Sequence, residues 1–181
     1  MEKDTFLDKY NPKRDVQFAL AQSIKASVQH NPTYTKNIDH SSKIKFRNYW
    51  KVRLQEIGLT FLENRDLKYY LEQVVDFSVE MNSMFSEILS PNKEFYDNGF
   101  RIAHSQKSIS VYLKHLWCMD AIPPPPCCPL DRIISERAGI LLPASWTKMN
   151  NISDIEITLN QFQGLAAHEN KLLCQWELEL F

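Results

Sequence analysis

Near its middle the chain reads Leu67-Lys-Tyr-Tyr-Leu-Glu-Gln-Val-Val-Asp-Phe-Ser-Val-Glu-Met-Asn-Ser-Met-Phe85. Apolar residues recur there every three to four positions, which is the period of one face of an α-helix. These positions are Leu67, Leu71, Val74, Phe77, Met81, Met84 or Phe85, and Ile88. Asn64 can cap the start of this helix, and Ser90-Pro91 follows its end. The pattern predicts an amphipathic helix that turns one side toward a core.

The same period recurs on both sides of this segment. It predicts further helices at 15–30, 43–57, 104–118, 129–138, from Ser153 onward, and at about 168–180. Asn31-Pro32 should end the first of these, Gly58 should follow the second, and Gly139 should close the one at 129–138. The chain has only four glycines, whereas sheet-rich folds need many more at turns. We therefore predict an all-α, compact domain of about six to seven helices over residues 1–181.

Local signals place two of the helix starts. Ser153 with Glu156 three positions later has the form of a capping box, and Ile152 with Ile157 has the form of a hydrophobic staple. The segment Ile122-Pro-Pro-Pro-Pro-Cys-Cys-Pro129 cannot be helical, because proline lacks the amide hydrogen that a helix requires. It predicts an extended polyproline loop between two helices, with Pro129 as the first helical residue and Asp131 in the first turn.

Composition indicates an ordinary folded domain in a reducing compartment. Of the residues, 44% are hydrophobic and 24% are charged. The apolar runs are too short to cross a membrane, and no signal peptide is evident, so the cytoplasm is the expected location. Cys118, Cys127, Cys128 and Cys174 lack the regular spacing of a secreted disulfide framework, which favours free thiols.

Charge is unevenly distributed, although the formal net charge is only −1. Five basic residues and no acid lie between positions 43 and 53: Lys43, Lys45, Arg47, Lys51 and Arg53. Arg101, Lys107 and Lys114 lie in a second acid-free stretch, together with His104 and His115. Such stretches indicate either a face that binds a polyanion or solvated helix surfaces that are basic by composition.

One segment carries a pattern that bears on chemistry. Lys107 precedes an apolar helix, the proline loop follows, and Pro129-Leu130-Asp131 enters the next helix, 24 residues after the lysine. This arrangement resembles the helix-hairpin-helix DNA glycosylases, and in style it is most similar to the archaeal 8-oxoguanine glycosylase branch. In place of the hairpin glycines of that family the chain has the single, more distant Gly99. The resemblance covers about 30 of the 181 residues.

The resemblance implies a base-excision enzyme that acts on damaged or modified duplex DNA without a cofactor or metal. Lys107 would be the nucleophile, activated at a helix N-terminus, where the macrodipole disfavours the ammonium form. Asp131 would stabilise the cationic sugar that forms as the base departs. The target nucleotide must leave the base stack, and Tyr112 or Trp117 are candidates to line its pocket. The predicted DNA-binding residues are Lys43, Lys45, Arg47, Lys51, Arg101, His104 and Lys114, with Arg101 and His104 in place of the glycine amides.

Structural alternatives accompany each of these residues. Asp131 in the first turn of a helix needs no catalytic role, and Lys107 can be a solvated lysine. His115 and Cys118 share a helix face and, with Cys127 and Cys128, define an alternative zinc site. A cysteine protease is rejected, because an apolar helix around Cys118 raises rather than lowers the pKa of a thiol.

Two functions compete with the enzyme. The first is a helical nucleic-acid-binding module that uses 43–53 and 101–114, and the second is a helical partner-binding protein from a defence or restriction context. Trp50 is expected in the core in every case, because aromatic residues at helical spacing usually pack inward.

Overall fold

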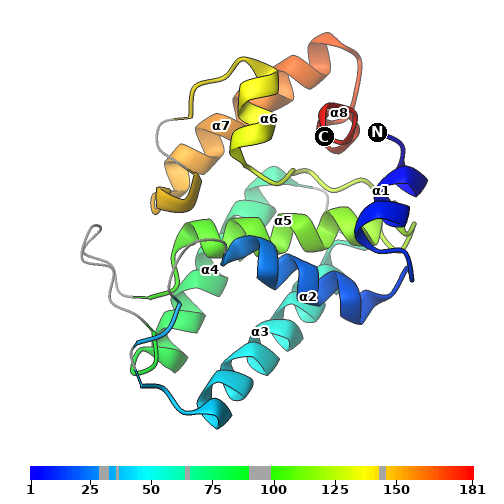
Figure 1. Ribbon diagram of the computed structural model, residues 1–181. Coiled ribbons are helices and arrows are strands. Elements are labelled where there is room, and N and C mark those ends of the chain that lie inside the picture. Colours follow the sequence, from blue (N-terminus) through cyan, green and yellow to red (C-terminus); the bar gives the residue numbers. More distant parts are fainter. Residues whose placement is uncertain (29–32, 36, 64–65, 90–98, 143–145) are drawn as a thin grey trace.

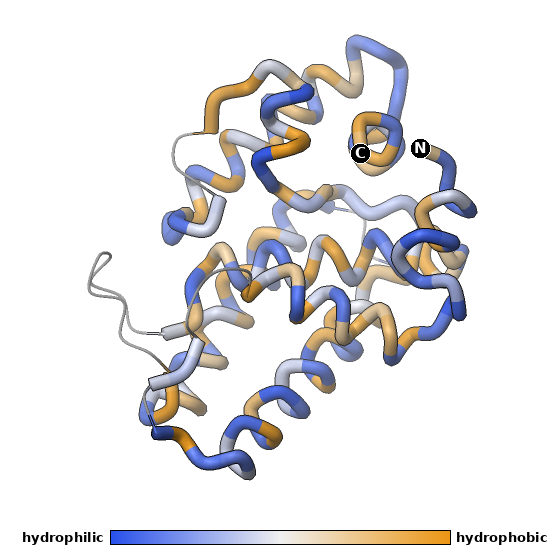
Figure 2. The backbone as a smooth tube through the Cα atoms, viewed as in Figure 1, coloured by the Kyte–Doolittle hydropathy of each residue, from blue (hydrophilic) through white to orange (hydrophobic). Residues whose placement is uncertain are grey.

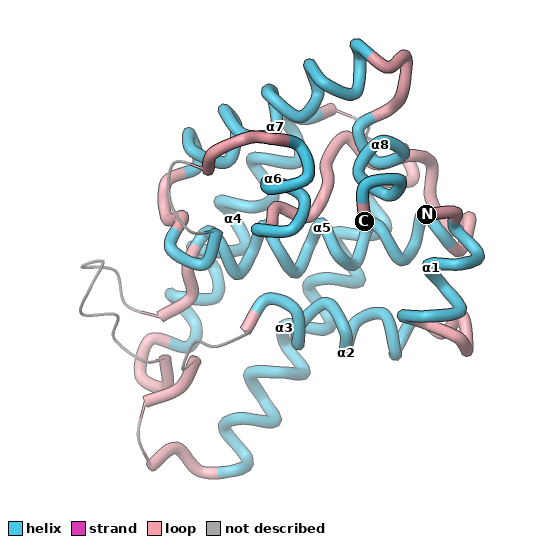
Figure 3. Tube along the Cα trace, turned by 45° about the horizontal axis from the view of Figure 1, so that its top comes forward, coloured by secondary structure: helices cyan, strands magenta, loops and turns pink. Residues whose placement is uncertain are grey.

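The computed structural model describes residues 1–28, 33–35, 37–63, 66–89, 99–142 and 146–181. These residues form eight α-helices and one 3₁₀ helix, and the only β-pairing among them is an isolated antiparallel bridge between Tyr34 and Leu89. The helices are α1 (Lys3–Tyr10), α2 (Val16–Ser27), α3 (His40–Thr60), α4 (Leu67–Phe85), α5 (Ile102–Cys118), α6 (Arg132–Ala138), η1 (Trp146–Lys148), α7 (Ile152–His168) and α8 (Leu173–Leu180). The all-α prediction is confirmed (Figure 3).

Helix α5 is the centre of the fold. Helices α2 and α3 lie on one side of it, α4 crosses behind it, and α6, α7 and α8 lie beyond its other side (Figure 1). We expected a single apolar face on α5, but all of its residues except Ile102 and Val111 are buried. A helix that is enclosed on several sides has no solvent face, so its polar residues become buried as well. The other helices alternate hydrophobic and hydrophilic residues along their length, as elements on the outside of a domain do (Figure 2).

A close approach holds α3 against α5. A Cβ atom added to Gly58 would lie 2.7 Å from Cε1 of Tyr112 and 3.0 Å from Cδ1 of Leu116. The prediction that Gly58 lies beyond the helix end is wrong, since α3 continues to Thr60. Trp50 is buried as predicted, and its indole nitrogen donates a 3.2 Å hydrogen bond to Ser108 on α5.

Side-chain caps define the starts of several helices. Asp15 caps α2 and Asp66 caps α4, each by accepting a hydrogen bond from a backbone amide of the first turn. The predicted cap Asn64 and the predicted stops Asn31-Pro32 and Ser90-Pro91 all include positions outside the described residues. Helix α2 ends at Ser27 with Val28 as its C-cap, so the predicted helix over 15–30 is too long.

Helices α1, α7 and α8 differ from prediction. Asn151, rather than Ser153, caps α7, because the Asn151 side chain accepts a hydrogen bond from the Ser153 amide at 3.0 Å. The predicted capping box of Ser153 with Glu156 is therefore wrong by two residues. Helix α1 was not predicted, since an eight-residue element with only Phe6 and Leu7 buried shows little periodicity. Helix α8 begins at Leu173 rather than near position 168.

The proline-rich segment is non-helical and joins α5 to α6, as predicted. Helix α6 nevertheless begins at Arg132, three residues after Pro129, so the prediction of Pro129 as its first residue is wrong. Asp131 is the N-cap, with extended backbone angles (φ −152°, ψ 171°). Gly139 ends the helix in the left-handed conformation (φ 68°), which confirms that prediction and which favours glycine.

In the part of the chain that the structure describes, no helix is both long enough and apolar enough to span a lipid bilayer.

Candidate active site

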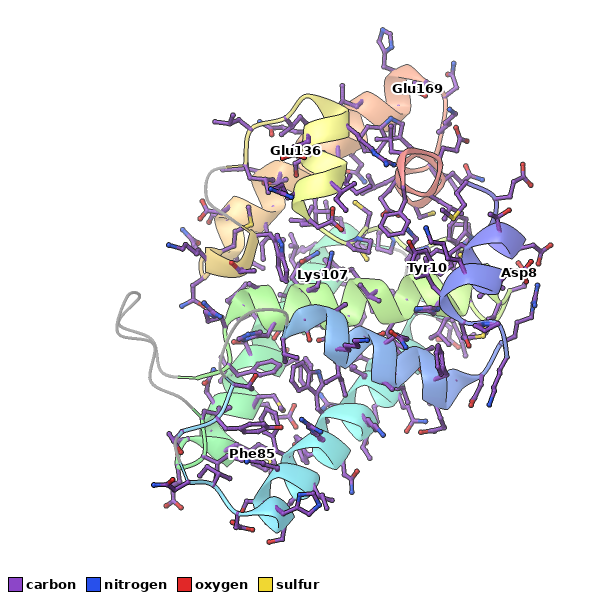
Figure 4. All side chains as sticks on the ribbon, in the orientation of Figure 1. Asp8, Tyr10, Phe85, Lys107, Glu136 and Glu169 are labelled. Carbon is purple, nitrogen blue, oxygen red and sulfur yellow. The ribbon has the colours of Figure 1, made fainter. Side chains whose placement is uncertain are left out.

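Lys107 and Asp131 are in direct contact. The Lys107 side chain projects from α5 toward α6 (Figure 4), and its Nζ atom lies 2.9 Å from Oδ2 of Asp131. The same Nζ atom donates a 3.3 Å hydrogen bond to the carbonyl of Leu130 and lies 5.2 Å from the centre of the Trp146 ring. Both side chains are largely buried, with 7% of Lys107 and 16% of Asp131 exposed. The two residues that sequence analysis paired are thus brought together by neighbouring elements.

The position of Lys107 in its helix differs from the prediction. Helix α5 begins at Ile102, so Lys107 lies in the second turn rather than at the N-terminus. The field of the helix dipole is concentrated in the first turn, so Lys107 lies largely outside it. The Asp131 carboxylate is the acid that contacts the Lys107 amine, at 2.9 Å.

Asp131 has a structural role in addition to its contact with Lys107. Its Oδ1 atom accepts a 2.9 Å hydrogen bond from the backbone amide of Ile134 and so caps α6. Its Oδ2 atom contacts Lys107. The cap fixes the carboxylate in place, so that one of its oxygens is presented to the amine.

The Lys107–Asp131 pair borders a cavity of about 730 Å³. The side chains around this cavity include four cations, Lys25, Lys107, Lys114 and Arg132, but only one acid, Asp131. Its aromatic lining comes from Phe6, Tyr10, Trp146 and Phe181. Neither Tyr112 nor Trp117, the aromatic residues proposed from sequence, lines it: Tyr112 packs on Gly58, and Trp117 lies under Lys3.

A second buried ion pair adjoins the same cavity. Lys114 lies two helical turns after Lys107, and its Nζ atom is 2.8 Å from Oε2 of Glu177 on α8. The centres of the Phe181 and Phe6 rings are 4.1 Å and 4.8 Å from this Nζ atom. Burial raises the pKa of Glu177, and the charge of Lys114 acts in the opposite direction.

His115 borders the cavity beside Lys114 and is only 2% exposed. Its Nδ1 atom has no hydrogen-bond partner among the described residues, and its ring packs against Phe6 at 5.0 Å. Burial, followed by the neighbouring charge of Lys114, lowers the pKa of His115 to about 4. The imidazole is therefore neutral at physiological pH.

Three of the predicted DNA-binding residues are inside the domain. Arg101, His104 and Lys114 are 6%, 2% and 5% exposed, so they do not form the external phosphate-binding face that we expected. His104 instead helps to cap α5, because its Nδ1 atom accepts a 3.0 Å hydrogen bond from the Arg101 amide. Burial, followed by the charge of Arg101, lowers the pKa of His104 to about 3. The central position of α5 explains this correction.

The other four predicted DNA-binding residues are accessible on α3. Lys45 and Arg47 are exposed, and Lys43 and Lys51 are half-buried. Arg47 and Lys51 border a second cavity of about 420 Å³ between α2 and α3. Lys25 on α2 borders both cavities, so the predicted basic segment lies next to the Lys107 site rather than apart from it.

The cysteines provide no evidence for the zinc alternative. Cys118, Cys127, Cys128 and Cys174 are all free and buried. Within the described ranges, no three His, Cys, Asp or Glu side chains are grouped as a metal ion requires. Burial raises the pKa of Cys118 to about 12, which supports the rejection of a cysteine nucleophile.

Several residues around the cavity could not be predicted from the sequence. Trp146 and Phe181 are far from Lys107 in the sequence, and no motif links them to it. The position of Glu177 could have been noticed, because it is an acid among the apolar residues of the last helix. A buried acid needs a cationic partner, so this position indicates a buried ion pair.

Comparison of the chain with family models, with curated proteins and with solved structures gives no match. The glycosylase resemblance therefore depends on the residues quoted above.

Proposed function

We propose that this protein is a DNA glycosylase with associated lyase activity, in which Lys107 forms a Schiff base with the sugar and Asp131 is its partner. The observation that supports the proposal is the 2.9 Å contact between the Lys107 amine and the Asp131 carboxylate at the wall of a large cavity. A buried amine with one fixed acid beside it is suited to nucleophilic catalysis.

The resting ion pair determines the order of proton transfers. Lys107 first passes one ammonium proton to Asp131, which leaves a neutral amine with a free electron pair. That pair forms a bond to the sugar C1′ as the bond to the base breaks, and the departing base takes the proton from Asp131. The ring bond from C1′ to O4′ then breaks, and O4′ takes a second proton from the nitrogen. The product is an iminium with one hydrogen on nitrogen, so all three original protons are accounted for.

The cavity suits an extrahelical nucleotide. A volume of about 730 Å³ falls in the usual range for small-molecule sites, and its aromatic lining offers surfaces on which a base can stack. Lys107 and Lys114 are paired with Asp131 and Glu177, so Lys25 and Arg132 are the cations of the lining that can attract the phosphates on either side of such a nucleotide.

Covalent trapping tests this function directly. Purified protein is incubated with duplexes that carry an abasic site, uracil or 8-oxoguanine, in the presence of borohydride, which reduces an iminium to a stable amine. We expect a protein–DNA adduct with the abasic duplex that is lost in Lys107→Gln. Lys68→Gln, which changes an exposed lysine that borders neither cavity, is the control and should retain the adduct. An adduct that persists in Lys107→Gln, or none with any duplex, contradicts the proposal.

A non-enzymatic nucleic-acid-binding module is the second candidate. It is favoured by the accessible cations of α3 and by the capping role of Asp131, which gives that residue a purpose without catalysis. This candidate predicts salt-dependent DNA or RNA binding that is unchanged in Asp131→Asn and is not accompanied by an adduct.

A further inference from the structure

The cavity between α2 and α3 has features of an anion-binding site. Lys25, Arg47 and Lys51 border it, and no acid lines it. Arg53, two residues after Lys51 on α3, differs from these cations: it pairs with Glu80 at 2.8 Å and also with Glu56. Among the described residues, no ion pair to an acid is found for Lys25, Arg47 or Lys51. Their charges are therefore available to a ligand.

Tyr34 holds part of this cationic rim in position. The Tyr34 hydroxyl accepts a 3.0 Å hydrogen bond from Nε of Arg47, and the Arg47 guanidinium lies 5.9 Å from the centre of the Tyr34 ring. Lys43 lies over the same ring at 5.7 Å. A guanidinium has five N–H groups in a fixed plane, so the bond to Tyr34 through Nε leaves the four N–H groups of the two Nη atoms for other acceptors. Phosphate oxygens match that geometry.

The cavity also has an apolar part. Ile24 of α2, Val28 directly after α2 and Trp50 of α3 line it together with the cations. An apolar lining with several cations suits a sugar–phosphate unit, whose sugar ring has apolar faces and whose phosphate is an anion. It does not suit a multivalent metal cation, which the three positive charges would repel.

Lys25 joins this cavity to the proposed active site. Helix α2 contributes Gln22 and Ala26 to the first cavity and Ala21 and Ile24 to the second, and Lys25 borders both. If a nucleotide occupies the first cavity, the strand that continues from it toward the second cavity would pass Lys25.

We propose that the groove between α2 and α3 binds a backbone phosphate of the DNA strand whose nucleotide occupies the cavity at Lys107, with Arg47 and Lys51 as ligands and Lys25 as the bridge. This inference rests on the proposed function and extends it from the reacting nucleotide to its neighbour on the same strand.

Binding measurements separate this site from the chemistry. The probe is a fluorescent duplex with a tetrahydrofuran abasic analogue, which has no aldehyde and cannot form a Schiff base. Arg47→Gln/Lys51→Gln should weaken binding by roughly 10- to 100-fold near 0.1 M salt, and it should reduce the slope of log affinity against log salt by about 1, since one phosphate contact is lost. Lys13→Gln/Lys68→Gln removes the same charge from exposed positions outside both cavities and should change neither quantity. Thermal unfolding checks that the variants are folded.

Two further binding experiments test whether one particular phosphate occupies the groove. Lys45 lies on α3 but does not border this cavity, so Lys45→Gln should have little effect. In a series of duplexes, one backbone phosphate at a time is replaced by a neutral methylphosphonate. Replacement of one phosphate close to the abasic analogue should weaken binding of the wild type. The same replacement should not weaken binding of the Arg47→Gln/Lys51→Gln variant. An equal loss in Lys45→Gln would indicate a diffuse basic surface and overturn the proposal. So would the absence of such a phosphate, or an unchanged salt slope.

The outcomes distinguish the two proposals. If the adduct forms as expected but the phosphate coupling is absent, the groove is not the subsite and the enzymatic function stands. If the coupling is present but no adduct forms, the groove binds DNA and the Schiff-base chemistry is wrong.

Discussion

Nζ of Lys114 and Oε2 of Glu177 lie 2.8 Å apart in a setting that leaves 6% of the lysine side chain and 1% of the glutamate side chain exposed. The pair connects the central helix α5 to α8. Oε1 of Glu177 accepts a 2.9 Å hydrogen bond from the same Nζ atom, so both carboxylate oxygens contact the ammonium. Removal of one partner leaves a buried charge without compensation, which is far more costly than removal of both.

Lys114→Met should therefore lower the free energy of unfolding by roughly 3–5 kcal/mol. Lys114→Met/Glu177→Leu should recover most of that loss, because neither charge remains. Urea unfolding of the wild type, both single variants and the double variant gives the coupling energy. Strictly additive losses would show that the two side chains do not depend on each other.

The buried histidines predict a loss of stability in mild acid. Burial lowers the pKa of His104 and His115 from the usual 6.5 to about 3 and about 4. Between these values and 6.5 the unfolded chain binds protons that the folded chain does not, so the free energy of unfolding falls as pH decreases through 6.5. Each histidine should contribute a fall of roughly 2 kcal/mol between pH 8 and pH 5.

The His115 contribution can be isolated by substitution. Glu177, whose pKa is raised, acts with the opposite sign, so the useful quantity is a difference between proteins. Urea unfolding at pH 8 and pH 5 should show a fall about 2 kcal/mol smaller in His115→Phe than in the wild type. His168→Gln, at an exposed position, is the control. An equal fall in His115→Phe and the wild type would show that His115 can be protonated in the folded protein.

Two helical glycines should respond to alanine in opposite ways. Gly58→Ala places a methyl group 2.7 Å from a ring atom of the buried Tyr112, so we expect a loss of roughly 1–3 kcal/mol despite the better helix propensity of alanine. At Gly164 in α7 nothing lies within 4 Å, so Gly164→Ala should add up to about 1 kcal/mol. Thermal and urea unfolding of the two variants test the assignment, and a stabilising Gly58→Ala would contradict the close approach of α3 and α5.

Substitutions at Asp131 can separate its cap from its ion pair. Asparagine retains a side-chain oxygen that can accept from the Ile134 amide, whereas alanine retains none. Both remove the carboxylate that contacts Lys107. Asp131→Ala should therefore be about 1 kcal/mol less stable than Asp131→Asn.

The cost of Asp131→Asn itself should decrease in a Lys107→Gln background, because the buried ammonium is then absent. Urea unfolding of the four proteins measures this effect. The expected covalent adduct should be lost or strongly reduced in Asp131→Asn even where the protein remains folded. Identical stability of the Asn and Ala variants would exclude the cap.

Much of the helical fold follows from local signals in the sequence. The period from Leu67 to Phe85 predicted α4, and Gly139 predicted the end of α6. These features depend on residues close together in the chain, so a single sequence reveals them. The start of α6 was misplaced because Pro129 and Asp131 both have the form of a helix start, and only coordinates show which position is used.

The candidate site could be predicted only in part. Lys107 and Asp131 lie on adjacent elements joined by one loop, so their meeting followed from local order. The burial of Arg101, His104 and Lys114 depends on which helices surround α5, and that is a property of long-range packing. The same holds for Lys25 of α2, which shares one cavity with Lys107 and another with Arg47.

The enclosure of α5 also determines how the domain opens. The backbone amides in the middle of this helix are hydrogen-bonded within it and covered by side chains from several neighbouring helices. Solvent deuterium can reach them only when those neighbours separate, whereas the ends of α1 or α6 can fray locally. Amides between Ile109 and Trp117 should thus exchange most slowly, with a protection free energy equal to that of global unfolding.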